Sequence, residues 1–410
     1  MSKEIDSLLE RIAQKDFRAS LEPIRQACAW LGNPQDQFKS IHIAGTNGKG
    51  STAAFLSSIL QEAGLKVGCM TSPHLIEVEE RIQIDREPIA RKKFHALIEE
   101  VLTFLPEEEF LSYFEMITAV GFLYFAREKV DVAVVEVGLG GRLDATNILK
   151  PAVGVLTTIA KDHEKILGDT LVKIAKEKCG IIKKGMKIVS VAQVDEVQRV
   201  IQNDCREKNV ELQVVDPSSI TTPLGLKGEH QKINAAAAVA AAARHCEGAG
   251  SLTLFGTSSA ISDGLRKTSW PGRLQILQER PTVLVDGAHN ESGMQTLARY
   301  LKANWQGTKF HFFVGALREK NPELLFQPIA PLAKHFYAVS VYTDRAMTPP
   351  ELKAVLDQTA VPTTALEGAI ALQWKKVLSA IPADEMVVAT GSLYLIGEVL
   401  QCFRKPAFDA

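Results

Sequence analysis

The fold of this chain is decided by one stretch, Ile41-His42-Ile43-Ala44-Gly45-Thr46-Asn47-Gly48-Lys49-Gly50-Ser51-Thr52. A short run of β-prone residues, 40–44, leads into a glycine-rich turn, and a helix-like segment follows at 52–62. Glycines let a backbone wrap around an anion, and the N-terminus of the next helix adds positive potential. The stretch therefore predicts a strand, a phosphate-binding loop at 45–52 and a helix.

Within this loop, Lys49 is expected to reach the terminal phosphates of a nucleotide, and Ser51 or Thr52 to hold Mg²⁺. The common pattern G-x-x-x-x-G-K-[ST] is not met, because Gly50 separates Lys49 from Ser51. An ordinary glycine-rich turn is the alternative interpretation. The combination of glycine, lysine and hydroxyl residues between a strand and a helix favours a phosphate loop.

Strand-like and helix-like segments alternate along most of the chain, which predicts α/β layering with mainly parallel strands. The turn-like sequence Trp270-Pro271-Gly272-Arg273 interrupts the alternation, which then restarts. We therefore predict a P-loop-containing domain over 1–270, a linker over 271–281 and a smaller Rossmann-like α/β domain over 282–410. The expected strands are 66–71, 131–137, 153–159, 187–191, 282–286, 309–314, 336–341 and 386–390, and the expected helices are 91–105, 114–127, 193–207, 234–245, 291–303, 350–358 and 393–403.

The composition is that of an ordinary globular protein, with 46% hydrophobic and 23% charged residues over 410 positions. Lys and Arg total 47 and Asp and Glu 48, which indicates neither a nucleic-acid footprint nor a basic membrane surface. The charged N-terminus does not look like a secretory signal, and no apolar run approaches the about 18 residues of a membrane span. Six scattered cysteines without C-x-x-C spacing indicate reduced thiols, so we expect a cytoplasmic location.

Three further polar segments follow predicted strands. They are Thr71-Ser72-Pro73-His74-Leu75, Val135-Glu136-Val137-Gly138-Leu139-Gly140-Gly141-Arg142-Leu143-Asp144-Ala145-Thr146-Asn147 and Thr157-Thr158-Ile159-Ala160-Lys161-Asp162-His163-Glu164. Ligands bind at the carboxyl ends of the strands in open α/β sheets, so all three are expected near the phosphate loop. Glu136 closes an apolar strand beside a glycine loop, which suits Mg²⁺ binding, although a structural Arg or Lys partner is the alternative.

The form GTNGKGS and these segments together resemble the Mur-type ATP-dependent amide ligases, and most closely the folylpolyglutamate synthase/dihydrofolate synthase family, from about residue 41 to 397. The resemblance implies ATP and two Mg²⁺ ions, with ligands among Ser51, Ser72, Glu136 and His163. It also implies that Lys178 is carbamylated, which turns an ammonium into an anion able to support Mg²⁺. A solvated lysine is the alternative. Cys179 and Lys161 depart from the family pattern.

The resemblance also assigns residues to the nucleotide. Asn234, with the segment around His230, is implied to hold the adenine, and helix capping is the alternative. Arg273 is implied to contact the γ-phosphate across a cleft, where a guanidinium suits the charge of a moving phosphoryl group. Asp286 and His289 match family residues that face ATP and the incoming glutamate, although Asp286 could instead cap the next helix.

For the other substrates, the resemblance implies that the loop containing Pro73 and His74, together with Arg81, lies against the pterin, and that His289 and Ser392 lie near glutamate. Two segments depart from the family pattern. GALREKN at 315–321 alters the acids of GAL-x-D-K-D, and TDRA at 343–346 has Asp where relatives typically have Pro. Both segments belong to the domain that is expected to recognise the amino acid.

We therefore expect an ATP-dependent ligase that joins L-glutamate to a folate or dihydropteroate carboxylate through an acyl phosphate, releasing ADP and phosphate. The expected catalytic residues are Lys49, Lys178, Arg273 and His289. The partners are small molecules, and we expect a monomer without nucleic-acid or membrane partners. The alternatives are a peptidoglycan Mur ligase, which would normally carry an N-terminal UDP-binding domain, a P-loop switch or motor NTPase, and a non-catalytic nucleotide-binding protein on the same fold.

Overall fold

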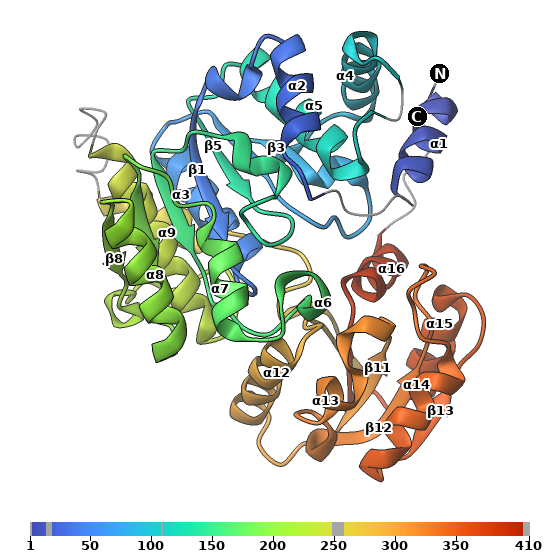
Figure 1. Ribbon diagram of the computed structural model, residues 1–410. Coiled ribbons are helices and arrows are strands. Elements are labelled where there is room, and N and C mark those ends of the chain that lie inside the picture. The colour runs from blue at the N-terminus through green and yellow to red at the C-terminus, as the bar shows by residue number, and fades with distance from the viewer. Residues whose placement is uncertain (1, 14–18, 108–109, 248–257, 405–410) are drawn as a thin grey trace.

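An eight-stranded sheet forms the centre of the first lobe, and a six-stranded sheet forms the centre of the second (Figure 1). The computed structural model describes residues 2–13, 19–107, 110–247 and 258–404. The larger lobe contains the N-terminal part of the chain, and the smaller one contains the C-terminal part (Figure 1). The predicted two-part α/β architecture is confirmed.

The larger sheet has the strand order β4-β3-β2-β5-β1-β6-β7-β8. Strands β3 and β4 form an antiparallel edge, and the other strands run parallel. Ile43 lies opposite both Glu136 and Val155, so the loops that follow β1, β5 and β6 leave the sheet side by side. The strands are β1 (Lys39–Ala44), β2 (Val67–Met70), β3 (Ile82–Ile84), β4 (Glu87–Pro88), β5 (Val132–Glu136), β6 (Val153–Leu156), β7 (Lys187–Ser190) and β8 (Glu211–Val214).

Helices cover both faces of this sheet, because its central strands are apolar on both sides. On one face, the small side chains of the alanine-rich helix α9 let it pack closely on α3, over Ile41 and Ile43. The helices of that face are α3 (Lys49–Glu62), α9 (His230–Cys246) and α11 (Ser258–Lys267). The other face carries α1 (Ser2–Ala13), α2 (Glu22–Trp30), α4 (Arg91–Phe104), α5 (Tyr113–Arg127), α7 (Leu171–Cys179) and α8 (Asp195–Glu207), and the short α6 (Glu164–Leu167) precedes α7.

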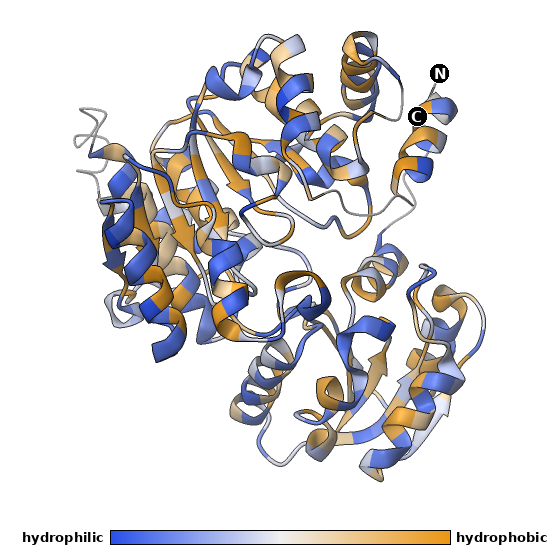
Figure 2. Cartoon of the chain, viewed as in Figure 1, coloured by the Kyte–Doolittle hydropathy of each residue, from blue (hydrophilic) through white to orange (hydrophobic). Residues whose placement is uncertain are grey.

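The second sheet has the order β13-β12-β11-β14-β10-β9, with β9 antiparallel at its edge. Its strands are β9 (Gln275–Glu279), β10 (Thr282–Val285), β11 (Phe310–Val314), β12 (Ala333–Ala338), β13 (Thr363–Ala365) and β14 (Met386–Thr390). One face carries α12 (Glu291–Asn304), α13 (Pro322–Phe326) and α14 (Pro349–Leu356), and the other carries α15 (Ile370–Ala380) and α16 (Leu393–Phe403). Figure 2 shows apolar strands within both lobes and helices with mixed hydrophobic and hydrophilic sides.

Most expected elements lie close to their predicted positions, and three differences are informative. Helix α3 begins at Lys49, three residues before the expected start at Thr52. The strand expected at 336–341 is β12, which ends at Ala338. Residues 275–279, which were expected in the linker, form β9 and pair with β10. The second sheet therefore begins before residue 282.

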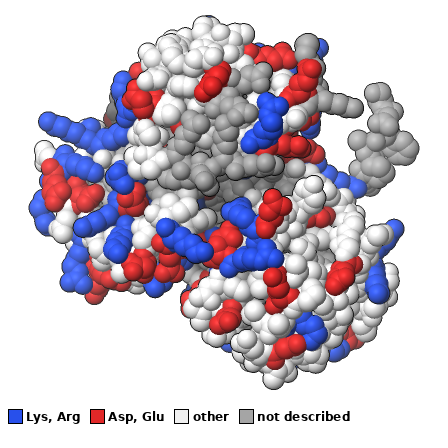
Figure 3. Space-filling view, turned by 45° about the vertical axis from the view of Figure 1, so that its right-hand side comes forward, with Lys and Arg blue, Asp and Glu red and all other residues white. Residues whose placement is uncertain are grey.

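The surface carries charges of both signs. On the face shown in Figure 3, Lys and Arg side chains are interspersed with Asp and Glu side chains over both lobes. Among the described residues, none of the helices combines the length and the apolar character needed to cross a membrane.

Candidate active site

A cavity of about 570 Å³ lies where the two lobes meet. The first lobe contributes the β1–α3 turn, the loops that follow β2, β5 and β6, and the start of α9. The second lobe contributes the loops that follow β10, β11, β12 and β14. All residues that the sequence assigns to a site line this cavity, except Thr52 and His74. The structure thus brings together segments that lie far apart in the chain.

The β1–α3 turn is anchored to the loop after β6. The backbone N–H groups of Thr46 and Asn47 donate to the carbonyl oxygen of Thr158, at 2.8 and 3.1 Å. The Thr46 hydroxyl donates to the carbonyl oxygen of Ala160 at 2.9 Å. Lys49 is the first residue of α3, so the N-terminus of that helix points into the cavity that the turn borders. This is the geometry of an anion-binding turn.

The two hydroxyls that were candidates for the cation differ in position. Ser51 lines the cavity, and its Oγ accepts a hydrogen bond from Gln231 Nε2 at 3.4 Å. Thr52 is fully buried outside the cavity lining, and its hydroxyl oxygen has no hydrogen-bond partner among the described residues. Ser51 is therefore the better placed candidate.

Gly48 precedes α3 in the left-handed region, with φ 91°. An added Cβ would lie 2.3 Å from Asn234 Oδ1. Asn234 is buried within the first turns of α9, and its Nδ2 donates to Gln231 Oε1 at 2.9 Å, so it does not cap that helix. Its amide group instead packs against the phosphate-loop glycine.

We expect Gly48→Ala to weaken ADP binding by about tenfold, because left-handed backbone strain and the displaced Asn234 together amount to about 1.4 kcal/mol or more. Gly64→Ala is the matched control, because Gly64 has φ 85° and open space around its Cα. The control carries the same kind of strain far from the turn. Calorimetric titration with ADP is the measurement, and equal affinities of the two variants would contradict the expectation.

Glu136 ends β5 and faces Lys49 across the cavity. Lys49 Nζ lies 3.7 Å from Glu136 Oε1 and donates to the Thr46 carbonyl oxygen at 3.2 Å. The backbone N–H of Ser72 donates to Glu136 Oε2 at 3.3 Å. Burial raises the pKa of the Glu136 carboxyl, while Lys49 and the Ser72 N–H oppose the rise. A lysine partner was the alternative to a metal role for Glu136, and here that lysine itself belongs to the phosphate loop.

Lys178 lies in α7 and is buried against the same turn. Its Nζ donates to the carbonyl oxygen of Gly45 at 2.8 Å. Burial, and to a lesser degree the charge of Lys49, lowers the pKa of Lys178 to about 7. The alternative of a solvated lysine is wrong, because the side chain is buried.

Two residues of the second lobe, Arg273 and Asp286, line the cavity. The charge of Arg273 opposes the effect of burial on the pKa of both Glu136 and Asp286. Asp286 accepts N–H groups of Leu274 and Ala288, whereas the cap of α12 is Asn290. Asp286 therefore does not cap that helix.

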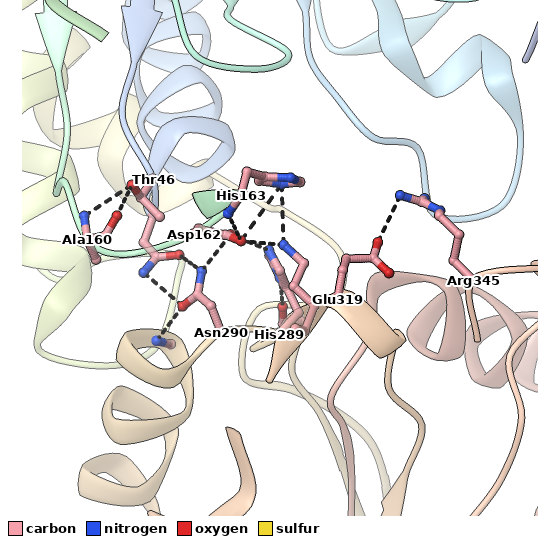
Figure 4. Close-up of polar contacts among 12 residues, drawn as sticks. Thr46, Ala160, Asp162, His163, His289, Asn290, Glu319 and Arg345 are labelled. Atoms are coloured by element: carbon pink, nitrogen blue, oxygen red, sulfur yellow. Dashed lines mark hydrogen bonds and ion pairs between the residues drawn. The ribbon is translucent and has the colours of Figure 1, made fainter. Parts of the chain in front are cut away.

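Sequence reasoning missed a polar cluster that joins the lobes around Asp162 (Figure 4). Lys320 Nζ lies 2.5 Å from Asp162 Oδ1 and 3.3 Å from His163 Nε2. Asn290 donates to Asp162 Oδ2 at 3.1 Å, and His289 Nε2 lies 3.8 Å from the same oxygen. Burial first, and then the charge of Lys320, lowers the pKa of His163 and of His289 to about 4.

The cavity is also lined by two aromatic residues that sequence reasoning missed, Tyr113 and Phe114 at the start of α5. The guanidinium carbon of Arg81 lies 5.3 Å from the centre of the Tyr113 ring. Arg81 Nε also donates to His74 Nδ1 at 2.9 Å, so His74 holds Arg81 from outside the cavity.

Arg345 and Ser392 of the second lobe also line the cavity. The Arg345 guanidinium donates to Glu319 Oε1 at 3.0 Å and to the Tyr394 hydroxyl at 3.2 Å. Glu319 belongs to the altered segment 315–321, and Arg345 to the altered segment 343–346. The two segments that depart from the family pattern are thus paired with one another.

Comparison with known proteins identifies the family. Residues 43–214 match the family model of the Mur ligase middle domain, and residues 273–402 match that of the dihydrofolate synthetase C-terminal domain. The chain is 34% identical to the dihydrofolate synthase/folylpolyglutamate synthase of Bacillus subtilis, over 93% of this chain and 94% of that protein. The chain belongs to the folylpolyglutamate synthase/dihydrofolate synthase family.

Solved structures of this family have the same fold. E. coli FolC in complex with DHPP and ADP superposes with a TM-score of 0.87 at 29% identity, covering 98% of this chain and 97% of that one. The bifunctional folylpolyglutamate synthase/dihydrofolate synthase of Yersinia pestis, complexed with AMPPNP and a Mn ion, gives a TM-score of 0.84 at 26% identity, covering 98% and 97%. The family resemblance inferred from GTNGKGS is confirmed.

Proposed function

We propose that this chain uses ATP to join L-glutamate to the carboxylate of a folate or of dihydropteroate. The observation that carries the proposal is the cavity between the lobes, where Lys49 and Glu136 of the first lobe face Arg273 of the second. Residues 1–270 act as the ATP-binding domain, and the chain from Arg273 onward, which includes β9, acts as the glutamate-ligase domain. Membership of the family supports each part of this assignment.

The reaction proceeds in two steps. A carboxylate oxygen of the acceptor first attacks the γ-phosphorus of ATP, which gives an acyl phosphate and ADP. The amine nitrogen of glutamate then attacks the carbonyl carbon, and phosphate leaves with the former carboxylate oxygen. A proton must leave the amine, and we assign it to His289, which lines the cavity and, with a pKa of about 4, is neutral at pH 7. A base this weak takes the proton only after the new C–N bond has made the nitrogen acidic.

Charge on the moving phosphoryl group is stabilised from both lobes. Lys49 approaches it from the phosphate loop and Arg273 from the second lobe, and such donors each contribute about 2.7–4 kcal/mol to the transition state. Because Arg273 belongs to the second lobe, the site is complete only when the lobes meet. Their contact also excludes water, which would otherwise hydrolyse the acyl phosphate.

The side chains around the cavity fit Mg²⁺. The described residues contain no group of three or more His, Cys, Asp or Glu side chains that could hold a metal ion. Mg²⁺ usually keeps several waters and binds one or two protein ligands together with substrate phosphates, so single donors suffice. We assign one ion to Ser51, Ser72 and Glu136 and a second to His163. The ions supply positive charge that neutralises the phosphates.

Lys178 is proposed to be carbamylated. Its neutral amine attacks CO₂, which forms an N–C bond, and a proton leaves. The pKa of about 7 supports this, because a neutral amine is the reactive form. The resulting anion would stand beside the Gly45 carbonyl and the charge of Lys49, where it can support a cation.

The flat ring of the acceptor is proposed to lie against Tyr113 and Phe114, where aromatic side chains offer stacking surfaces. Pro73 and Arg81 border the same end of the cavity, and His74 positions Arg81. The adenine is assigned to Asn234 and His230. The carboxylates of glutamate are assigned to the end that contains Ser392 and Arg345.

We expect Arg345→Met to raise the KM for glutamate by about ten- to a hundredfold, because a hydrogen bond to a charged group contributes about 1.5–3 kcal/mol. Arg318→Met is the matched control, because Arg318 lies in the neighbouring segment but pairs with Glu351 outside the cavity. Steady-state kinetics with varied glutamate is the measurement. An unchanged KM in Arg345→Met would remove Arg345 from the glutamate site.

The assignment is tested by a ligation assay with dihydropteroate and with tetrahydrofolate side by side, each with ATP, Mg²⁺ and L-glutamate. A product heavier by one glutamate residue, formed with one ADP, is expected with at least one acceptor. ATP hydrolysis without product would indicate an uncoupled NTPase, and no turnover would indicate a nucleotide-binding protein. Either result would contradict the proposal.

The cellular setting is also part of the proposal. All six cysteines are free thiols, and five of them are buried. Free thiols are typical of a reducing compartment, which supports a cytoplasmic location. We further propose that the protein acts as a monomer, because residues of a single chain line the cavity on both sides.

A further inference from the structure

The cluster around Asp162 contains a cation that belongs to the protein itself. The Lys320 ammonium lies 2.5 Å from Asp162 Oδ1 and 3.3 Å from His163 Nε2. The side chains of Lys320 and Asp162 are each only 8% exposed. An ammonium has no acceptor capacity, so both contacts are donated by Lys320. The lone pair of His163 Nε2 that would bind a metal ion is therefore used by Lys320.

The two acceptors lie close enough for a single cation to draw both of them into its coordination shell. Asp162 Oδ1 and His163 Nε2 are 3.8 Å apart. Neighbouring ligands of an octahedral Mg²⁺, at bonds of about 2.1 Å, lie about 3.0 Å apart, so a shift of about 1 Å by either side chain brings both atoms onto one ion. The cavity wall that holds Lys320 also contains the phosphate-loop residue Asn47, which bonds to Asn290 at 2.9 Å. The position therefore adjoins the nucleotide site.

We propose that the Lys320 ammonium occupies the second divalent-cation position, between Asp162 and His163, and that a divalent cation must displace it to bind there. The inference rests on the proposed cation role of His163, and it adds Asp162 as a further ligand. Two positive charges cannot share this position, because no described anion besides Asp162 lies within ion-pair distance of Lys320.

Displacement has a consequence for the lobes. Lys320 follows β11 in the second lobe, whereas Asp162 and His163 follow β6 in the first. Binding of the second cation therefore removes one contact that holds the lobes together, while Asn290 and His289 keep their contacts with Asp162. Cation binding and the position of the second lobe are thus coupled through Lys320.

The test is a titration of the purified full chain with Mn²⁺ in the presence of AMPPNP, following free Mn²⁺ by electron paramagnetic resonance. Removing Lys320 frees both ligands, so in Lys320→Met the ion at His163 should bind about tenfold more tightly than in the wild type. Lys161→Met removes a lysine charge from the loop that contains Asp162 and His163, where Lys161 pairs with Glu164, and should leave the affinity unchanged.

Two further variants distinguish a failure of the proposed cation role of His163 from a failure of the proposed displacement of Lys320. His163→Ala in the wild-type chain should remove one bound Mn²⁺, and an intact Mn²⁺ count would overturn the proposed cation role of His163. His163→Ala combined with Lys320→Met should abolish the gain in affinity. If His163→Ala removes the ion but Lys320→Met binds Mn²⁺ no more tightly than wild type, or if the gain persists in the double variant, the displacement by Lys320 is wrong.

Discussion

Lys49→Met is expected to lower kcat for glutamate ligation by about 10²–10³-fold, the loss typical of removing one donor aimed at transition-state charge. Lys49 is the first residue of α3, and its Nζ is held by the Thr46 carbonyl oxygen and by Glu136. Methionine keeps the length and the apolar stem, so the loss should reflect the missing charge. Single-turnover rates at saturating ATP measure the effect.

Lys66→Met is the matched control for this experiment. Lys66 precedes β2 in the same sheet and also pairs with a glutamate, at 3.2 Å from Glu128 Oε2, but it lies away from the cavity. A partly exposed ion pair contributes little, so ligation by this variant should stay close to wild type. A rate for Lys49→Met within tenfold of this control would contradict the assigned role.

Lys178→Met is expected to remove the carbamate. It should also lower kcat for ligation by a factor similar to that expected for Lys49→Met. The carbamate is measured as a ¹³C resonance after equilibration with ¹³CO₂. Because only the neutral amine reacts and the pKa of Lys178 lies at about 7, the signal at a fixed CO₂ pressure should grow as the pH rises from about 6 to 8. An exposed lysine, with its pKa near 10.4, would remain almost fully charged over this range.

Lys183→Met provides the control for burial. Burial also lowers the pKa of Lys183, to about 8, but its Nζ donates to the carbonyl oxygens of Asn147 and Leu149 and it does not line the cavity. The resonance should persist in this variant. If the resonance instead survives in Lys178→Met and disappears in Lys183→Met, the carbamate is on Lys183, and the proposed role of Lys178 is contradicted.

The phosphate loop and its neighbours were predictable because the information is local. GTNGKGS follows an apolar strand, Glu136 ends a neighbouring strand of the same sheet, and His163 lies in the loop after another. The carboxyl ends of parallel strands meet at one edge, so these side chains had to converge whatever the rest of the chain did.

The remaining parts of the site depend on how the lobes meet, which no local pattern encodes. Lys320 lies in a segment noted only for its altered acids, and its partner Asp162 comes from the other lobe. Tyr113 and Phe114 begin a helix that is apolar on nearly every side. The periodicity of its hydrophobic residues therefore could not distinguish residues that line the cavity from residues of the core. Residues 275–279 read as a linker because an antiparallel edge strand is short and only half-buried.

The most direct test of the central claim follows one oxygen atom through the reaction. The acceptor is labelled with ¹⁸O in the reacting carboxylate, and the phosphate released during ligation is analysed by mass spectrometry. If the γ-phosphoryl group is transferred to the carboxylate in the cavity between the lobes, each phosphate carries one ¹⁸O. Unlabelled phosphate, formed while the glutamate product accumulates, would contradict the acyl-phosphate mechanism.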